Sequence, residues 1–402
     1  MMDISTAQPT TISQEEFIAF KLYDALKGGH QIAIWKSPKS SSIQLIVDKT
    51  EKVKKVDLDL DQLPAGFIAH TFSQEDDKKA YFLRASDYIK LELDLPVSTE
   101  VIDEAFLSKK MDSEEIKGFI KDFWQQNHPK KPKNDIVSSS KEDFIQYVEL
   151  GISAINAGEI AKVVPSRIKQ VRPNADFDLV RTFLRLCKTY PNTFVNFFHI
   201  PNIGTWLGAT PEILIKTEDK FFYTMALAGT QRAQGDNPIK NAAWTQKEIE
   251  EQALVSRYIV NNFKKIRLRE YEENGPKTVL AGNLLHLRSD FRVDMEATNF
   301  PQLGAVMLKL LHPTSAVCGT PKEKAMDFIL KHEKFDRSFF SGFIGPVNIE
   351  NQTSIYVNLR TAQILNGEVI LYAGAGVTED SNPEKEWEET SLKCEIIGKF
   401  IQ

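Results

Sequence analysis

The chain has 402 residues, of which 42% are hydrophobic and 26% are charged, and its formal net charge is −5. This composition is that of a globular protein with a large core, and the length allows two or three domains or one large α/β domain. The mild excess of acidic groups argues against non-specific binding to nucleic acid and offers no attraction to anionic lipid. We therefore expect neither a nucleic-acid partner nor a membrane partner.

The three cysteines, Cys187, Cys318 and Cys394, are too few and too far apart for a disulfide framework or a paired-cysteine metal site. No uninterrupted apolar stretch approaches the ~20 residues that span a bilayer. Residues 1–17 contain no basic segment followed by an apolar one, so we expect no secretory signal. These features predict a cytoplasmic protein, which we expect to be a monomer or a weak homodimer.

The N-terminal third alternates strand-like runs, such as Gln31–Trp35 and Ile43–Val47, with short helical stretches. Residues 128–140 are rich in Lys, Pro and Ser, which is typical of a connecting loop. This segment is either a domain linker or a surface loop within one domain, and we favour the surface loop.

A helix is predicted directly after this segment. Ser140 is a suitable N-cap, acidic residues follow it, and Phe144, Val148, Ile152 and Ile155 recur at helical spacing. Longer helices are predicted from Thr245 to about Lys264 and from Pro383 to Phe400. Strands are predicted at Lys162–Val164, Thr193–Phe198, Thr205–Leu207, Glu212–Lys216, Phe221–Ala226, Ser354–Leu359 and Val369–Tyr372. Strands in runs with helices between the runs favour an α+β layered architecture with mainly antiparallel sheets over a doubly wound parallel sheet.

Two of the predicted helices carry acidic groups that suit a metal ion. Glu386 and Glu389 are three residues apart, so their carboxylates lie on one face of the C-terminal helix. Together with Glu251 on the other helix they could hold Mg²⁺, which uses one or two carboxylates and keeps several water ligands. The alternative is two solvated acidic helix faces, which the charge pattern alone favours.

Two further residues are candidates for acid–base chemistry. Lys162 begins an apolar strand, so it is either an edge residue facing water or a side chain in a cleft, where burial could make it a base. Glu212 follows a Gly/Pro turn and precedes an apolar run. It is either a general acid held protonated by its surroundings or an ordinary glutamate at a strand edge.

Glycines and isolated cations could receive an anion. Residues 228–230 (AGT) and 374–376 (GAG) are predicted to be glycine turns at the ends of apolar strands, where backbone N–H groups can approach a ligand. Arg360 and Lys393 could bind a carboxylate, although each taken singly suits a surface charge better. His286 and His312 lie in apolar surroundings that are typical of core histidines.

Taken together, seven segments resemble those of the chorismate-binding enzymes, which include the isochorismate, salicylate, anthranilate and aminodeoxychorismate synthases. The segments occur in the family's order and are KVVPSR (162–167), WLGATPE (206–212), ALAGTQR (226–232), LLHPTSAVCGTPK (310–322), FDRSFFSGFIG (335–345), YVNLRTAQI (356–364) and YAGAGVTEDSNPEKEWEETSLK (372–393). The resemblance divides the chain into a divergent N-terminal part of the same fold, residues 1–135, and a chorismate-binding catalytic region, residues 140–400.

This resemblance implies two large, mainly antiparallel sheets packed face to face, with helices around them and an Mg²⁺-dependent cleft. It makes Glu251, Glu386 and Glu389 the metal carboxylates, with chorismate as the small-molecule substrate. It makes Arg360, Lys393 and the backbone near Gly374 the groups that receive the substrate carboxylates, and it places His286 near the reacting ring. The full set of implied substrate-binding positions is Gly229, Thr230, His286, Ala316, Phe340, Arg360, Gly374 and Lys393.

Four positions sort the subfamilies by resemblance. Lys162 stands where isochorismate and salicylate synthases carry the base that activates water, whereas anthranilate synthases usually carry glutamine. Ala228 stands where aminodeoxychorismate synthases carry a nucleophilic lysine. Ala316 and Phe340 are typical of isochorismate synthases, because salicylate synthases usually carry threonine and tyrosine there.

The sequence therefore predicts an isochorismate synthase of menaquinone or siderophore biosynthesis. Lys162 would be the base for attack of water at C2, and Glu212 the acid for loss of the C4 hydroxyl. The alternatives are a salicylate synthase, which would go on to eliminate pyruvate, and a catalytically silent chorismate-binding regulatory protein. One residue departs from the family pattern, because Gln252 stands where a histidine usually follows the metal glutamate.

Overall fold

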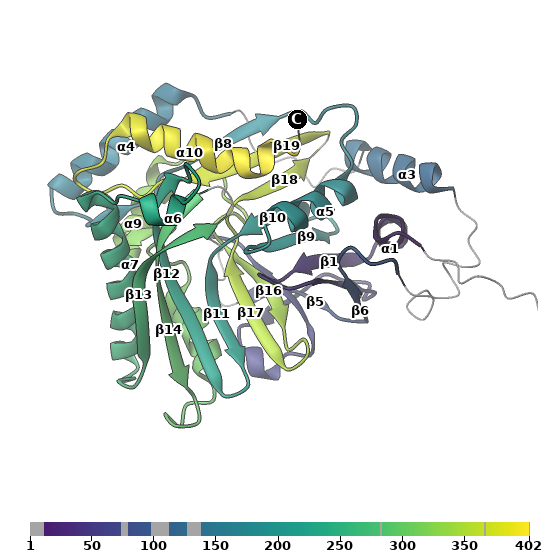
Figure 1. Ribbon diagram of the computed structural model, residues 1–402, viewed down its shortest axis with the longest axis horizontal. Coiled ribbons are helices and arrows are strands. Elements are labelled where there is room, and N and C mark those ends of the chain that lie inside the picture. The colour runs from purple at the N-terminus through teal and green to yellow at the C-terminus, as the bar shows by residue number, and fades with distance from the viewer. Residues whose placement is uncertain are drawn as a thin grey trace, which may run out of the picture.

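The computed structural model describes residues 12–73, 79–97, 112–126, 138–281, 284–365 and 367–401. Two large sheets dominate the molecule, one of eight strands and one of nine, and the pairings within both are antiparallel. Helices lie around these sheets (Figure 1). The α+β architecture predicted from the sequence is thus confirmed.

The eight-stranded sheet has the order β6-β2-β1-β9-β10-β18-β19-β8. Its strands are β1 (Gln31–Lys36), β2 (Ser42–Asp48), β6 (Asp87–Glu92), β8 (Ser166–Val171), β9 (Phe194–Ile200), β10 (Gly204–Thr210), β18 (Thr361–Leu365) and β19 (Glu368–Gly374).

The nine-stranded sheet has the order β13-β14-β12-β11-β17-β16-β4-β5-β3. Its strands are β3 (Lys54–Asp57), β4 (Gly66–His70), β5 (Lys79–Arg84), β11 (Ile213–Glu218), β12 (Phe221–Arg232), β13 (Glu272–Ala281), β14 (Leu284–Asp294), β16 (Phe343–Val347) and β17 (Gln352–Val357). A separate two-stranded ribbon joins β7 (Lys162–Val163) to β15 (Gly319–Thr320).

Most of the described helices pack against the two large sheets. The described helices are α1 (Gln14–Lys27), α3 (Ser113–Gln126), α4 (Lys141–Asn156), α5 (Leu179–Thr189), α6 (Pro238–Asn241), α7 (Gln246–Lys265), α8 (Leu303–Leu311), α9 (Lys322–His332) and α10 (Pro383–Gly398), with a 3₁₀ turn, η1, at Leu60–Gln62. Of the helices described, none is long and apolar enough to cross a membrane.

Local sequence signals account for where the predicted helices begin. The Ser140 side chain accepts a hydrogen bond from the N–H of Asp143 and caps α4. Thr245 and Glu248 form a capping box at the start of α7. Asn382 caps α10, and Pro383 occupies its first turn. All three helices begin where the sequence predicted, and α10 ends at Gly398, two residues earlier than expected.

The N-terminal strands are divided between the two sheets. β1 pairs with β9 in the eight-stranded sheet, whereas β4 pairs with β16 in the nine-stranded sheet. The predicted boundary near residues 135–140 and most of the predicted loop at 128–140 fall on residues 127–137, which lie outside the described part of the chain. The division into two regions therefore stays a prediction.

Large aromatic side chains fill the space between the two sheets. Trp35 of β1 packs against Phe67 of β4 with ring centroids 5.5 Å apart. Phe194 of β9 stacks on Tyr356 of β17 at 4.0 Å. Both pairs join a strand of one sheet to a strand of the other, and all four side chains are buried. The sheets therefore pack face to face through a common core, as the family resemblance implied.

One buried arginine connects the segments that lead to the site. Arg337 donates hydrogen bonds to the carbonyl of Val164 at 2.8 Å and to the carbonyl of Val317 at 2.9 Å. Its guanidinium also forms a two-pronged ion pair with Glu333, at 2.6 and 2.7 Å. Because Val164 directly follows β7, this arginine fixes the position of the ribbon that begins with Lys162.

We predict that Arg337→Met lowers the free energy of unfolding by about 3–5 kcal/mol, because it leaves a buried carboxylate and two buried carbonyls without their partner. Chemical denaturation followed by circular dichroism measures this change. Arg181→Met is the matched control, since Arg181 pairs with Glu15 at the surface and its loss should cost less than about 1 kcal/mol. Equal effects of the two substitutions would contradict the bridging role of Arg337.

Candidate active site

The site begins with the pair formed by Lys162 and Glu251. Lys162 is the first residue of β7 and is fully buried. Of the two alternatives that the sequence left open, the edge residue facing water is therefore wrong, and the side chain points into the interior. Its Nζ lies 3.1 Å from Oε1 of Glu251 on α7. A Cβ on Gly376 would lie 2.0 Å from that same oxygen, so only glycine allows this chain segment to pass so close to the pair.

The two other predicted metal carboxylates lie on α10 and face the same region. Glu386 is 2% exposed and Glu251 is 6% exposed. The alternative interpretation, two solvated helix faces, is therefore wrong for these residues. Glu389 is also largely enclosed, and its Oε1 accepts a hydrogen bond of 2.6 Å from Lys393. The three carboxylates thus come from two helices and point inward.

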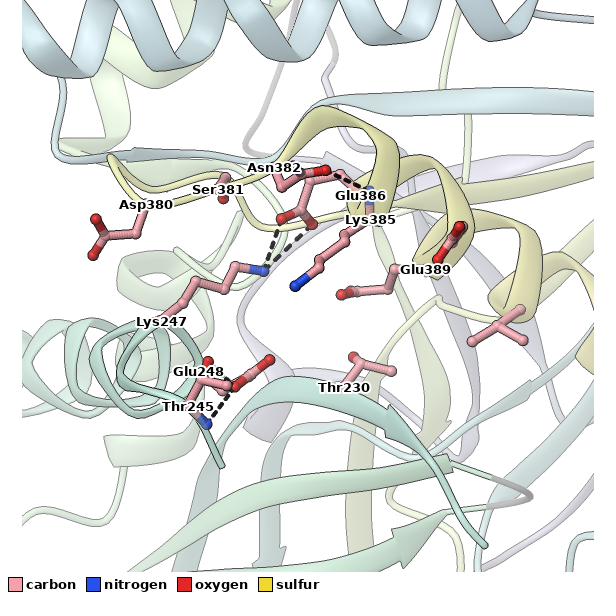
Figure 2. Close-up of a pocket in the computed structure, with 12 residues that line it drawn as sticks. Thr230, Thr245, Lys247, Glu248, Asp380, Ser381, Asn382, Lys385, Glu386 and Glu389 are labelled. Carbon is pink, nitrogen blue, oxygen red and sulfur yellow. Dashed lines mark hydrogen bonds and ion pairs between the residues drawn. The ribbon is translucent and has the colours of Figure 1, made fainter. Parts of the chain in front are cut away.

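Each of these carboxylates faces a lysine. Lys247, one turn before Glu251 on α7, places its Nζ 3.0 Å from Oε1 of Glu386 and 4.0 Å from Oε2 of Glu251. Figure 2 shows the Lys247 side chain reaching across to Glu386, with Glu389 and Lys385 beside it. Lys247 is the residue of this cluster that our sequence analysis missed, and its four-residue spacing from Glu251 was the available signal.

The burial of these side chains and the charges around them shift their pKa values. Burial would raise the pKa of Glu251, but Lys162, Lys247 and Lys393 together lower this pKa to about 2. Burial raises the pKa of Glu386 to about 7, because desolvation and the neighbouring carboxylates outweigh the attraction of Lys247. Burial would lower the pKa of Lys247, but Glu251, Glu389 and Glu386 raise it above the usual lysine value.

Glu212 lies at the junction of β10 and β11 and is 3% exposed. Burial raises the pKa of this carboxyl to about 7, against the opposing pull of Arg360, Lys162 and Lys393. The structure therefore excludes an ordinary glutamate exposed at a strand edge. Near neutral pH a large share of Glu212 carries a proton, which is the state a general acid requires.

Arg360 and His286 form a second polar group beside Glu212. Arg360 is buried, and its Nη2 lies 3.5 Å from Nε2 of His286. Burial, together with the charges of Arg360 and Lys393, lowers the pKa of His286 to about 3, so the ring is neutral. Its Nδ1 lies 2.7 Å from the carbonyl of Gly229, and a hydrogen bond donated there leaves Nε2 as the acceptor. The interpretation of Arg360 as a surface charge is therefore wrong. His286 is buried, as expected of a core histidine, and it also contacts Arg360.

The two glycine segments differ from each other in the structure. Gly374 ends β19 as expected, and its carbonyl accepts a hydrogen bond of 2.8 Å from Lys393. Gly229 does not end a strand. It lies within β12 at a bulge, with φ of +69°, between register positions Ala228 and Gln231. The prediction of a strand-end turn is wrong there because the strand continues past the bulge to Arg232.

Of the remaining predicted positions, Thr230 lies beside the predicted metal carboxylates, whereas Phe340 and Ala316 pack in the hydrophobic core. Thr230 lines a cavity of about 250 Å³ together with Lys247, Glu386 and Glu389. Phe340 is buried in the core between the sheets and stacks on Tyr372 at 5.4 Å. Ala316 is half-buried and packs against the core that α7 and α8 cover. Gln252, which stands where the resemblance implies a histidine, donates hydrogen bonds to Ala226 and Ser289 and so holds α7 on the sheet.

The donor set suits Mg²⁺ chemically. Three inward-facing carboxylates, each paired with a lysine, come together here, and carboxylate oxygen is the ligand that Mg²⁺ prefers. Among the described residues, however, the acidic side chains whose oxygens approach one another within 4.8 Å are Glu250, Glu379 and Asp380, at a more exposed position. Mg²⁺ requires only one or two protein carboxylates, so the wider spacing of the predicted set is compatible with the ion.

A comparison of the sequence with protein families identifies the group to which the chain is related. Residues 80–402 match the family described as "Chorismate binding enzyme". The chain belongs to this family. The match includes every residue of the cluster described above, from Lys162 on β7 to Lys393 on α10.

Individual relatives agree with this assignment. The chain is 29% identical to the isochorismate synthase EntC of Escherichia coli (strain K12), over 63% of this chain and 66% of EntC. It is 31% identical to the isochorismate synthase DhbC of Bacillus subtilis (strain 168), over 63% of this chain and 66% of DhbC. The matched part thus spans slightly less than two thirds of either relative.

A solved structure shows that the similarity of fold extends further along the chain. The crystal structure of a DhbC from Bacillus anthracis superposes with a TM-score of 0.71 and covers 95% of this chain and 99% of that chain, at 21% identity. At that coverage the likeness of fold includes most of the N-terminal strands, where our sequence analysis found no family motif.

We predict that Glu212→Gln stabilises the protein at high pH. A carboxyl whose pKa rises from 4.5 to about 7 on folding contributes stability that is full below pH 4.5 and is lost as the pH rises through about 7. Glutamine does not ionise, so the free energy of unfolding of the variant, relative to that of the wild type, should increase by about 2–3 kcal/mol from roughly pH 5 to roughly pH 8. Denaturant unfolding at the two pH values measures the difference.

Glu218→Gln makes the same chemical change at a half-exposed position on β11 and serves as the control. A difference between Glu212→Gln and the wild type that is the same at both pH values would show that Glu212 does not titrate in this range.

Proposed function

We propose that this protein is an Mg²⁺-dependent isochorismate synthase that converts chorismate into isochorismate. The observation that carries the proposal is a single enclosed group containing a buried lysine, Lys162, and a buried carboxyl, Glu212, whose pKa is raised to about 7. An isomerase that adds water at one carbon and removes hydroxide at another needs both a base and an acid in one site. The relatives named isochorismate synthases support this choice of reaction.

Lys162 and Glu212 have complementary tasks in this proposal. Lys162 takes a proton from water as its oxygen bonds to C2 of the ring. Glu212 gives a proton to the C4 hydroxyl, which leaves as water while the ring double bonds shift. One water enters and one leaves, so the product is an isomer of the substrate. Before it can act as a base, Lys162 must release its ion pair with Glu251.

The cations of the site receive the two carboxylates of the substrate. Arg360 offers a planar guanidinium that matches a carboxylate, and Lys393 of α10 reaches the carbonyl of Gly374 at the end of β19. The neutral His286 adds a hydrogen-bonding ring without adding charge. Glu251, Glu386 and Glu389 would hold Mg²⁺, which when bound would offset the negative charge of the ring carboxylate and orient it.

Water rather than ammonia is the proposed nucleophile. Lys162 stands where anthranilate synthases usually carry glutamine, and Ala228 stands where aminodeoxychorismate synthases carry a nucleophilic lysine. Ala316 and Phe340 favour release of isochorismate over further elimination of pyruvate. The product would serve menaquinone or siderophore biosynthesis.

We predict that Lys162→Ala and Glu212→Gln each lower kcat by ~10²–10⁴-fold, the usual contribution of a general base or acid. A coupled spectrophotometric assay for isochorismate measures the rates. Lys169→Ala and Glu218→Gln remove exposed or half-exposed groups of the same kind on β8 and β11, and both should keep nearly full activity. Normal turnover by either site variant would remove that residue from its assigned role.

Product analysis tests the proposed reaction directly. Purified protein incubated with chorismate and Mg²⁺, without ammonia, should form isochorismate, which chromatography separates from salicylate and pyruvate. Addition of a chelator should stop the reaction. Salicylate together with pyruvate would instead assign the protein to the salicylate synthases, and unchanged chorismate would indicate a silent binding protein.

A further inference from the structure

The position of Lys247 is not explained by the acid–base chemistry above. Its side chain is 14% exposed, and its ammonium lies between two carboxylates of the proposed metal site, 3.0 Å from Glu386 and 4.0 Å from Glu251. It extends from α7 toward α10 and so bridges the two helices that supply those carboxylates (Figure 2). A cation that is part of the chain therefore occupies the space between the metal ligands.

An ammonium group and Mg²⁺ compete for the same oxygens. Both are compact cations that seek carboxylate oxygen, and two cations a few ångströms apart in an enclosed site repel each other strongly. Lys162 and Lys393 already face Glu251 and Glu389, so the carboxylates have their charge balanced before any ion arrives. Entry of Mg²⁺ therefore requires at least one lysine to leave.

We infer that the ammonium group of Lys247 occupies the cation position, by which we mean the space between Glu251 and Glu386. Mg²⁺ must displace this ammonium group when it binds. This inference rests on the proposed function, because it takes Glu251 and Glu386 as metal ligands. Lys247 is the lysine best placed to leave, since it contacts two of the carboxylates and lies beside a cavity of about 250 Å³. Glu248, Asp380 and Glu388 line this cavity and provide carboxylates for the displaced ammonium.

Displacement of Lys247 would couple the metal to the substrate. Mg²⁺ alone adds two positive charges to a group that already contains Lys162, Lys247, Arg360 and Lys393, so it should bind weakly. A substrate with two carboxylates offsets that added charge, and each partner then raises the affinity of the protein for the other. Lys247 would thus keep the site free of metal until a dicarboxylate is present.

Isothermal titration calorimetry with Mg²⁺ alone tests the inference without any measurement of activity. Lys247→Gln removes the competing charge, and we expect it to bind Mg²⁺ about tenfold more tightly than the wild type, or tighter still. Lys247→Met, which keeps an unbranched side chain, should give the same result. Chorismate should raise the Mg²⁺ affinity of the wild type more than that of either variant.

Lys385→Gln is the matched control. Lys385 lines the same cavity, but within the described part of the chain it forms no ion pair with the metal carboxylates. Its removal deletes one positive charge from the cavity without vacating the cation position, so the Mg²⁺ affinity should change less than about threefold. An equal gain in Lys385→Gln and Lys247→Gln would mean that general electrostatics, not displacement, sets the affinity.

The outcomes separate this inference from the proposed function. If the wild type forms isochorismate with Mg²⁺ but both Lys247 variants bind the ion no more tightly than the wild type, the inference fails and the function stands. If no protein binds Mg²⁺ and no product forms, the function itself fails. A variant that folds poorly without metal still gives an answer, because displacement predicts that added Mg²⁺ raises its Tm more than that of the wild type.

Discussion

The rest of the structure depends on one constraint, which is that the charged side chains of the candidate site are buried and must be paired. Three carboxylates and four cations are enclosed where α7 and α10 face the ends of β7 and β19. Isolated charges cannot be buried in this way without a large cost in free energy, so each has to face an opposite charge. The pairs Lys162–Glu251, Lys247–Glu386 and Lys393–Glu389 meet this requirement for six of the seven groups. The fourth cation, Arg360, is attracted by Glu389 and Glu212.

The surrounding fold holds the two members of each ion pair close together. Arg337 connects the chain after β7 to the segment before β15, and Gln252 holds α7 against β12 and β14. Gly376 allows the chain after β19 to pass against the Lys162–Glu251 pair. None of these three residues carries out a chemical step in our proposal. They act by fixing the backbone from which the reactive side chains project, and a small displacement there would separate buried charges from the groups that balance them.

The same environment gives chemically similar side chains different roles. Glu212 and Glu251 are both buried glutamates, yet the pKa of the first is about 7 and that of the second about 2. The difference arises because Glu251 lies in direct contact with Lys162, whereas at Glu212 desolvation outweighs more distant cations. One carboxyl is thereby suited to deliver a proton and the other to hold a cation.

The sequence by itself determined the α+β class, the starts of α4, α7 and α10, and the family, because caps, strand-forming runs and ordered motifs are local signals. It also named Lys162, Glu212 and the three glutamates that we propose as metal ligands, although the local pattern alone favoured solvated surface positions for the acidic helices and for Lys162. Only the tertiary structure showed that these charges are buried, that Gly229 forms a bulge within β12, and that Lys247 stands among the carboxylates. The physical reason is that burial and ion pairing depend on which distant segments meet, and residues 162, 247 and 386 meet only when two sheets and two helices have packed together.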